Sequence, residues 1–353
     1  MTFFLILLIV VLLGVTFWQL SNFLAITFGN SDNSQVANNA DNQKQGKFML
    51  YFVLFLYALM AFCFIEYYSY FLPAASSEHG VDYDRLMQIS VVLIMFVQIL
   101  TQGFLHFFAY KYKGKKDQKA TYYADNNTLE MIWTIIPVIT LAGLILYGLY
   151  TWTTIMNIDE DDEDALIVEL YAYQFGWRAR YAGNDNELGK ANVRFIEGVN
   201  TLGVDKSDNY AMDDIITSEL HLPVNKRVIF KMRSQDVLHS AYMPFFRAQM
   251  NVVPGMITEF SYIPTQTTEE IRLSDFMVEK VETINNIRRD KSKLLLAKGE
   301  EALEPYEFDY YLLCNKICGA SHFNMQMKIV VESESDFKNW ISEQKTFKQV
   351  VSN

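Results

Sequence analysis

The chain has 353 residues, of which 51% are hydrophobic, and a formal net charge of −11 at pH 7. Its length allows two domains, and its acidic balance is the opposite of a basic nucleic-acid-binding surface, so no nucleic acid is expected as a partner. The apolar residues are unevenly spread: most of them lie before residue 153 in four long runs, and the remainder has the composition of an ordinary soluble domain.

Four runs almost free of charge predict four transmembrane helices. Residues 1–31, Leu86–Tyr110 and Met131–Trp152 contain no Asp, Glu, Lys or Arg, and Phe48–Leu72 contains only Glu66. About 20 apolar residues in a helix cross a bilayer core, so each run is long enough to span. The first run could instead be a signal peptide, but it lacks a basic n-region and exceeds the usual apolar length, so a retained helix is expected.

The loops between these runs predict the orientation. The first loop, residues 29–47, is a polar stretch expected to be a flexible linker, and it ends with Lys44 and Lys47. The third loop, residues 111–128, holds five lysines, whereas the second holds three acids and one arginine. Because lysine and arginine mark cytoplasmic loops, we expect a multi-pass protein of a bacterial inner membrane. Both termini and the domain that follows residue 154 would then lie on the periplasmic side.

An acidic run follows the fourth helix. Residues 159–164 read Asp-Glu-Asp-Asp-Glu-Asp, six acids in a row. Two interpretations remain open. The run can be a solvated spacer, or it can add to a negative field that steers a basic redox partner towards the protein.

From residue 165 onward the pattern predicts β-structure. The runs Ala165–Tyr173, Ser218–Pro223, Arg227–Met232 and Met327–Glu332 are rich in β-branched and aromatic residues and bounded by turn residues. Several such strands over some 190 residues indicate a sandwich or barrel. His221 alternates with apolar neighbours within one of them and is expected to be structural. Residues 277–306 instead favour a helix with both charge signs interleaved, which indicates a helical insertion between strands.

The segment from Cys314 to Met325 carries the strongest chemical signal. It has the pattern C-x3-C-x3-H-x2-M, in which Cys318 and His322 are the middle members, and His239 lies about 75 residues earlier in Asp-Val-Leu-His-Ser. Thiolate, imidazole and thioether donors together suit copper better than any hard cation. Two other interpretations remain: a disulfide between the cysteines, or a structural zinc, although zinc sites more often use C-x2-C spacing and do not recruit methionine.

This pattern closely resembles the dinuclear CuA centre of the cytochrome c oxidase subunit II family. The resemblance implies two copper ions bridged by the thiolates of Cys314 and Cys318. It further implies that His239 and His322 each bind one copper and that Met325 is a weak ligand. The backbone carbonyl of the residue between the cysteines, Lys316, would complete the set. Binding to the metal would itself deprotonate both thiols.

The resemblance also implies the architecture. The expected fold is an α-helical transmembrane N-terminal half of four helices, followed by an all-β cupredoxin-type Greek-key barrel with a helical insertion. Residues 86–153 would form the transmembrane hairpin of the family, and residues 154–353 the periplasmic copper domain with its insertion at about 277–306. Residues 1–85 would add two helices that the family usually lacks. Glu130, in Glu-Met-Ile-Trp-Thr-Ile-Ile-Pro, matches a family glutamate at the entrance of a proton pathway into subunit I; the alternative is an interfacial carboxylate at a helix N-terminus.

Two positions depart from the family pattern. Lys316 stands where the family has a glutamate that binds Mg²⁺ at the boundary with subunit I, and an ammonium cannot ligate that ion. The magnesium site is therefore not expected, although Asp236 occupies its other position. Phe175 replaces the tryptophan through which electrons enter, while Trp177 is retained. We expect an altered docking surface for the donor and a c-type cytochrome other than an ordinary soluble one, for example one tethered to a neighbouring respiratory complex.

The expected function is that of the electron-entry subunit of a cytochrome c oxidase, a proton-translocating oxidoreductase in which a partner subunit reduces oxygen. Subunit I and other oxidase subunits would be its partners. The chain has no C-x-x-C-H, so it carries no fused c-type haem. A quinol oxidase subunit would lack the copper ligands, and nitrous oxide reduction would need a further catalytic domain and leaves four membrane helices unexplained. A structural subunit with a disulfide predicts no metal and leaves His239 and Met325 without a role.

Overall fold

The computed structural model describes residues 2–28, 39–115, 118–158, 162 and 164–352. Contacts between residues divide the chain into two compact units. One unit comprises residues 1–66 and 94–130, and the other comprises residues 67–93 and 131–353. The second unit therefore contains the β-domain together with the first turns of one long helix and most of another, and this unit holds the features on which function depends.

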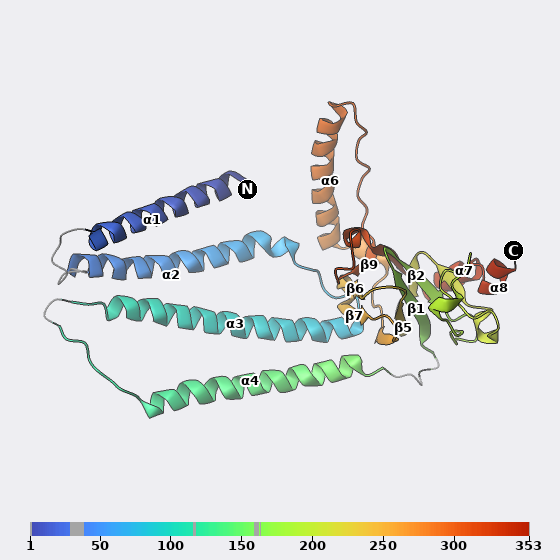
Figure 1. The fold of residues 1–353 in the computed structure, drawn as a ribbon, viewed down its shortest axis with the longest axis horizontal. Coiled ribbons are helices and arrows are strands. Elements are labelled where there is room, and N and C mark those ends of the chain that lie inside the picture. Colours follow the sequence, from blue (N-terminus) through green and yellow to red (C-terminus); the bar gives the residue numbers. More distant parts are fainter. Residues whose placement is uncertain (1, 29–38, 116–117, 159–161, 163, 353) are drawn as a thin grey trace. The chain divides into compact units, whose positions relative to one another are not determined.

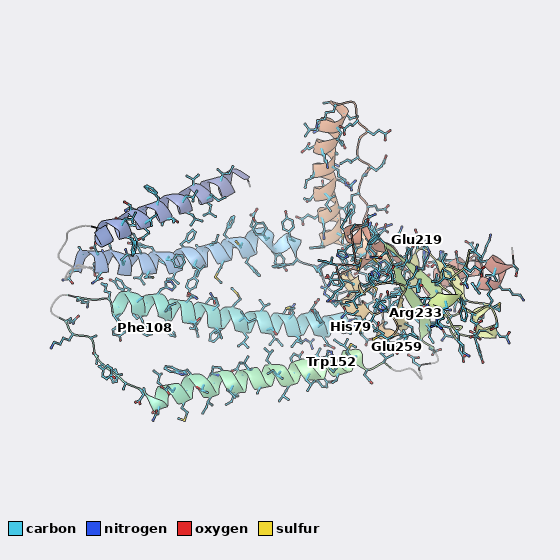
Figure 2. All side chains as sticks on the ribbon, viewed as in Figure 1. His79, Phe108, Trp152, Glu219, Arg233 and Glu259 are labelled. Carbon is cyan, nitrogen blue, oxygen red and sulfur yellow. The ribbon has the colours of Figure 1, made fainter. Side chains whose placement is uncertain are left out.

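Four long helices form the N-terminal half of the chain, as predicted (Figure 1). They are α1 Thr2–Phe28, α2 Asn39–Tyr67, α3 Glu78–Lys111 and α4 Asn127–Met156. Among the described residues, α2, α3 and α4 are long and apolar enough to cross a membrane, and α1 contains a shorter apolar stretch, Leu8–Leu24. Most of the large apolar side chains that the structure describes on these helices are exposed, as expected of lipid-facing or subunit-facing helices. Figure 2 shows the side chains along each helix.

The predicted flexible linker at residues 29–47 is wrong for its second half. Residues 29–38 lie outside the described part, but Asn39–Lys47 is the beginning of α2. Gly46 lies against the end of α3, where an added Cβ would come within 3.3 Å of the Tyr110 ring and 2.8 Å of Lys113. This close approach of two helices gives the polar residues a packing reason to be helical that their composition does not reveal.

The β-domain is a sandwich of two five-stranded sheets. One sheet has the strand order β3-β2-β1-β5-β8 and the other β4-β10-β9-β6-β7. The strands of the first sheet are β1 Leu166–Tyr173, β2 Gly176–Tyr181, β3 Ile215–Thr217, β5 Val228–Ser234 and β8 Thr258–Tyr262. Those of the second are β4 Leu220–Pro223, β6 His239–Met243, β7 Ala248–Val252, β9 Tyr310–Cys314 and β10 Gln326–Glu332. Two pairs, β1 with β5 and β4 with β10, are parallel, and the others are antiparallel.

The core lies between the two sheets. Alternate residues of the central strands point into it, as the period of two requires: Val168, Leu170 and Ala172 of β1 meet Leu312 of β9 and Ile329 of β10 in one buried cluster. All four predicted strands are present, within one or two residues of the predicted bounds. The predicted all-β domain is therefore confirmed, and its rigid ladders are suited to holding loops in place.

The predicted helical insertion is also present but shorter. Helix α6 spans Asp275–Leu296 and begins at Ser274, whose side chain accepts a hydrogen bond from the Met277 backbone N–H. It follows the short α5 Thr268–Arg272. The chain after α6 returns along the helix without regular structure until β9, held by side chains such as Asn285, which bonds the backbone of Tyr306. Helices α7 Glu334–Ser342 and α8 Phe347–Val351 follow the last strand.

Candidate metal centre

Three segments meet at one end of the sandwich because of the register of β6 and β9. These strands are antiparallel, with Ala241 opposite Cys314. The first residue of β6, His239, therefore lies beside the last residue of β9. The loop after β9 then folds back, and the Cys314 backbone N–H donates to the Met325 carbonyl at 3.1 Å. Residues 75 positions apart are thus brought to one point.

All five predicted side-chain ligands converge there. The Cys314 Sγ lies 3.9 Å from the Cys318 Sγ and 3.9 Å from the His239 Nδ1. The Cys318 Sγ lies 3.7 Å from the His322 Nδ1 and 3.7 Å from the Met325 Sδ. The two sulfurs form the centre, with one histidine on each. A group of three such side chains is close enough to share a metal ion, since their ligand atoms lie within 4.8 Å of one another; among the described residues this group is His239, Cys314 and Cys318.

The backbone carbonyl of Lys316 lies 3.2 Å from the Cys314 Sγ, so it reaches the same cluster. Its side chain is exposed. The sequence-based expectation that an ammonium at this position leaves the carbonyl available is consistent with this geometry. The arrangement offers two sulfurs, two imidazole nitrogens, a thioether and a carbonyl oxygen to one small volume.

The thiols are free and shielded. Both cysteines are unbonded, and Cys318 is buried. Burial, reinforced by the neighbouring Cys314 thiol, raises the pKa of Cys318 to about 11. A bare thiol here would therefore stay protonated at neutral pH, and a soft metal ion supplies the positive charge that would remove its proton.

Asp236 orients one histidine from behind. Its Oδ1 lies 2.9 Å from the Nε2 of His239, whose Nδ1 faces the sulfurs. The same carboxylate accepts backbone N–H groups from Val237 at 2.7 Å and Gln174 at 2.8 Å. Burial opposes the charge on Asp236, but these hydrogen bonds, led by that of His239, hold its pKa below the ordinary value. A carboxylate that fixes the outer nitrogen of a ligating histidine is a recurrent feature of metal sites.

The β1–β2 turn covers the centre from the other sheet. The Gln174 side-chain amide donates to the Cys318 carbonyl. Phe175 lies against Gly319, where an added Cβ would come within 2.8 Å of its ring. Phe175 is 37% exposed, whereas Trp177 is 2% exposed and packs edge-on to His239 at 6.3 Å between ring centroids. The structure thus places Phe175 at the surface and Trp177 inside, next to His239, a predicted ligand.

Two predicted residues lie elsewhere. His221 stacks on Trp340 at 3.8 Å and bonds the Glu332 carboxylate at 2.8 Å, so its predicted structural role is confirmed. Glu130 lies in the first turn of α4 and is exposed.

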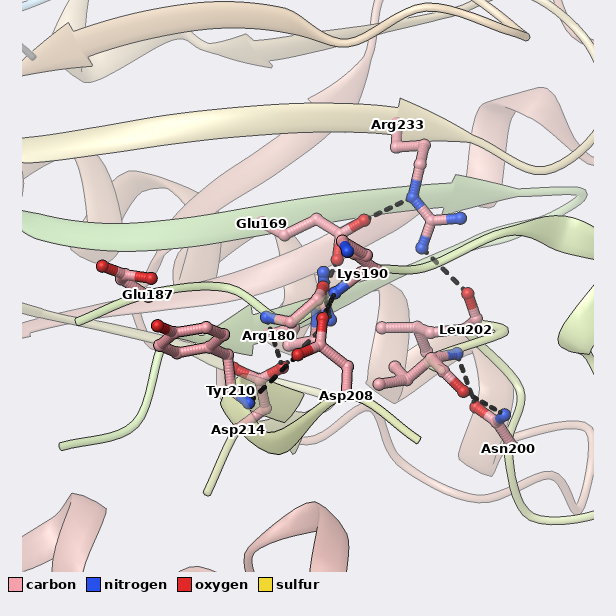
Figure 3. A network of polar contacts seen from close by, with 12 residues as sticks. Glu169, Arg180, Glu187, Lys190, Asn200, Leu202, Asp208, Tyr210, Asp214 and Arg233 are labelled. Atoms are coloured by element: carbon pink, nitrogen blue, oxygen red, sulfur yellow. Dashed lines mark hydrogen bonds and ion pairs between the residues drawn. The ribbon is translucent and has the colours of Figure 1, made fainter. Parts of the chain in front are cut away.

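A buried ionic network, which no sequence pattern indicated, covers the outer face of the first sheet (Figure 3). Glu169 is bonded by both Arg180 and Arg233, and Arg180 also bonds Asp214 at 3.0 Å. Burial raises the pKa of Asp214 to about 7 even though Arg180 opposes the shift. Glu169, Arg180 and Arg233 alternate with core residues on β1, β2 and β5. Arg180 and Arg233 also bond the backbone carbonyls of Gly189 and Leu202, so the network holds the insertion between β2 and β3 on the sheet.

Comparison with known proteins gives consistent results. Residues 65–151 match the family model described as cytochrome c oxidase subunit II, transmembrane domain. The chain is 30% identical over 266 residues to the alternative cytochrome c oxidase subunit 2 of Bradyrhizobium diazoefficiens, which covers 75% of this chain and 80% of that protein. It is 21% identical to cytochrome c oxidase subunit 2 of Cereibacter sphaeroides, with 77% of each covered. The solved periplasmic domain of subunit II of cytochrome oxidase of Bradyrhizobium japonicum is 18% identical, with a TM-score of 0.29, over 51% of this chain and 93% of its own.

Proposed function

The chain belongs to the cytochrome c oxidase subunit II family, and we propose that it is the electron-entry subunit of its oxidase. It would accept electrons from a c-type cytochrome at a dinuclear copper centre and pass them to the haem of subunit I, in a respiration coupled to proton translocation. The observation that carries this proposal is the convergence of five side chains on one point, of which three are buried; the five are Cys314, Cys318, His239, His322 and Met325.

The donor set fits copper. Two thiolates, two imidazoles and a thioether are soft to borderline ligands. In the part of the chain that the structure describes, the backbone carbonyl of Lys316 is the hard oxygen donor that reaches the cluster. When bound, a copper pair sharing two thiolates supplies one-electron transfer with little rearrangement. A quinol oxidase subunit would not need these ligands, and all of them are present here.

The protein residues keep that site rigid and dry. The ladder between β6 and β9 fixes His239 against Cys314. Asp236 holds His239 from outside, and Trp177 packs against the same ring. Buried Met325 shields the Cys318 sulfur. Because every neighbour is held by a strand or a hydrogen bond, the ligands would move little when the charge of the centre changes.

The surface around the centre supports docking of partner proteins. Ile317 and Phe323 are 87% and 86% exposed on the loop between β9 and β10, and Phe175, on the turn of the other sheet, lies against Gly319 of that loop. Exposed apolar side chains at a functional site mark interaction surfaces. We assign electron entry to Phe175, with Trp177 behind it, and expect the donor to be a c-type cytochrome other than an ordinary soluble one. Subunit I would cover another part of this surface.

The membrane half supports the remaining parts of the proposal. With four spanning helices, both termini and the copper domain would lie on the periplasmic side of the inner membrane, and Glu130 at the start of α4 would lie at the opposite side. That position suits an entrance for protons into subunit I. The segment 1–85 would be an addition to the transmembrane hairpin at residues 86–153 and the copper domain at residues 154–353.

The proposal is tested in the intact oxidase with Cys318→Ser, with Ser207→Ala in an exposed loop as a control. Loss of one of two bridging sulfurs should abolish the thiolate-to-copper absorption and rapid reduction by a c-type cytochrome, while the haem spectra persist. An unchanged absorption spectrum in Cys318→Ser would show that the bridging assignment is wrong.

A further inference from the structure

We infer that residues 73–84, which comprise the end of the connection between α2 and α3 and the first turns of α3, are a second tether of the copper domain, in addition to the chain connection after α4. In this role Arg247 and Asp84 are positioning residues, which fix the hairpin of β6 and β7 on the start of α3. The effect that we expect on electron transfer rests on the proposed function, because His239, a proposed copper ligand, is the first residue of that hairpin.

The backbone of the segment is inserted into the β-domain. The Ser76 N–H donates to the Phe245 carbonyl at 2.8 Å, and the Ser76 carbonyl accepts from the Thr265 N–H at 2.9 Å. Two residues on, the Glu78 N–H donates to the Ile263 carbonyl at 3.1 Å. Ser76 and Ser77 are fully buried. Ser77 also forms an isolated β-bridge with Pro264. The backbone of residues 76–78 is therefore paired with the domain and does not lie as a loop on its surface.

Buried side chains complete the attachment. The Ser77 hydroxyl donates to the Phe246 carbonyl at 2.6 Å, and the Tyr310 hydroxyl donates to the Ser76 hydroxyl at 3.0 Å. The ring of His79, which Figure 2 shows where α3 begins beside the domain, packs edge-on to Phe260 at 5.5 Å.

Arg247, in the β-domain, binds residues at both ends of the segment 73–84. Its Nε and Nη2 donate to the two carboxylate oxygens of Asp84 at 2.8 and 2.9 Å, a bidentate pair. Its Nη2 also donates to the Pro73 carbonyl at 2.6 Å, and its Nη1 to the Pro244 carbonyl at 2.9 Å. The Arg247 backbone has φ of 52°, a conformation that non-glycine residues rarely adopt. One buried side chain thus joins both ends of the segment to the β6–β7 connection.

The first turn of α3 is shaped for this contact. A Cβ at Gly80 would lie 2.5 Å from the Ala75 Cβ and 2.7 Å from the Ser77 hydroxyl, so only glycine allows the helix to start so close to the segment. On the other side, Ile155 and Met156 at the end of α4 pack against the main core. Two membrane helices are therefore attached to the domain, one by the chain and core packing, the other by the tether.

This double attachment has a functional consequence. Electron transfer from the copper centre to a haem in a partner subunit needs a fixed separation, and small displacements lower such rates steeply. A domain attached only after α4 could rotate about one connection. The tether removes that freedom by fixing β6 and β7, the hairpin that contains His239, to a second helix.

The experiment uses Asp84→Asn in the intact oxidase, with Asp82→Asn as the matched control. Asp82 lies two residues earlier on the same helix, its side chain is 56% exposed, and its ion pair is with Arg85 on α3 itself. In Asp84→Asn we expect the backbone amides of Ser76, Glu78 and Thr265 to exchange hydrogen faster, and electron transfer from copper to haem to slow by about tenfold with copper content and spectrum unchanged. Asp82→Asn should change neither quantity. Arg247→Lys, which keeps the charge but loses the fork, should give an intermediate effect and serves as the second variant if Asp84→Asn fails to assemble.

The two readouts separate the possible failures. Unchanged amide exchange in Asp84→Asn and Arg247→Lys overturns the tether itself. Faster exchange with an unchanged electron-transfer rate overturns the positioning role. If the wild-type oxidase contains no copper in this subunit, the proposed function fails, and amide exchange still decides whether residues 73–84 are a tether.

Discussion

Asp236→Asn tests whether the carboxylate behind His239 is part of the metal site. In the structure Asp236 bonds the outer nitrogen of His239 at 2.9 Å while the inner nitrogen faces the Cys314 sulfur. Asparagine has nearly the same shape but no charge, and its single carbonyl oxygen cannot replace both carboxylate oxygens. The substitution therefore weakens the support of one ligand and leaves all ligands in place.

The expected magnitude follows from two independent estimates. Replacing an outer partner of a metal-bound histidine typically weakens metal binding by about 10- to 100-fold. A lost hydrogen bond to a charged group costs about 1.5–3 kcal/mol, and about 1.4 kcal/mol corresponds to tenfold in affinity. The two ranges overlap, so we expect copper affinity to fall by one to two orders of magnitude. The reduction potential should rise, because a less electron-rich imidazole favours the lower charge on the metal.

The assay is a competition titration of copper between the purified oxidase and a chelator of known affinity, followed through the absorption of the copper centre. Glu343→Gln, an exposed carboxylate outside the site, is the control and should match the wild type. A fold of the domain that is unchanged by circular dichroism excludes misfolding as the cause. An affinity of Asp236→Asn within twofold of the wild type would refute the role of this hydrogen bond.

Three further outcomes are expected. Met325→Leu conserves volume at a buried position and should cost less than about 1.5 kcal/mol of stability. The variant should keep its copper, but the reduction potential of the copper centre should change. Loss of copper on elemental analysis would show that Met325 is more than a weak ligand. Phe175→Leu should slow reduction of the copper centre by the cytochrome in stopped-flow experiments without changing the copper content. Phe195 is also exposed, and Phe195→Leu should leave the rate of reduction unchanged. Equal rates in the two variants would show that electrons do not enter through Phe175. Burial raises the pKa of Asp214 to about 7, so the folded state binds the carboxyl proton of Asp214 more tightly than the unfolded state does. The contribution of Asp214 to the free energy of unfolding therefore falls as pH rises from about 4 to about 7, by at most about 4 kcal/mol. Asp214→Asn should remove this fall in stability between pH 4 and 7. If thermal unfolding of Asp214→Asn showed the same pH dependence as the wild type, the raised pKa of Asp214 would be contradicted.

The sequence revealed the candidate ligands because their spacing is local. Four of the five side chains lie within twelve residues, between Cys314 and Met325, and a loop of that length brings its members together whatever the rest of the fold. His239 is distant in sequence, and only the resemblance to the family joined it to the others. Hydrophobic runs likewise revealed the long helices, since a charge-free stretch has few alternatives to a membrane span.

Contacts between distant segments were not predictable. Residues 73–84 carry three acids and small polar residues, a composition typical of an exposed loop, yet Ser76 and Ser77 are fully buried. Their polar groups are satisfied by the carbonyls of Phe245 and Phe246, about 170 residues away, and no sequence pattern at either end indicates such a pair. For the same reason no local pattern indicates that Glu169 and Arg180 are buried, because Arg180 bonds Gly189 and Asp214 of the segment before β3 as well as Glu169.

Counting metal atoms and unpaired electrons in the purified oxidase tests the central claim most directly. Elemental analysis combined with electron paramagnetic resonance should find two copper ions in this subunit that share one unpaired electron, in addition to any copper in subunit I. A single copper, a zinc ion or a Cys314–Cys318 disulfide in its place would contradict the account.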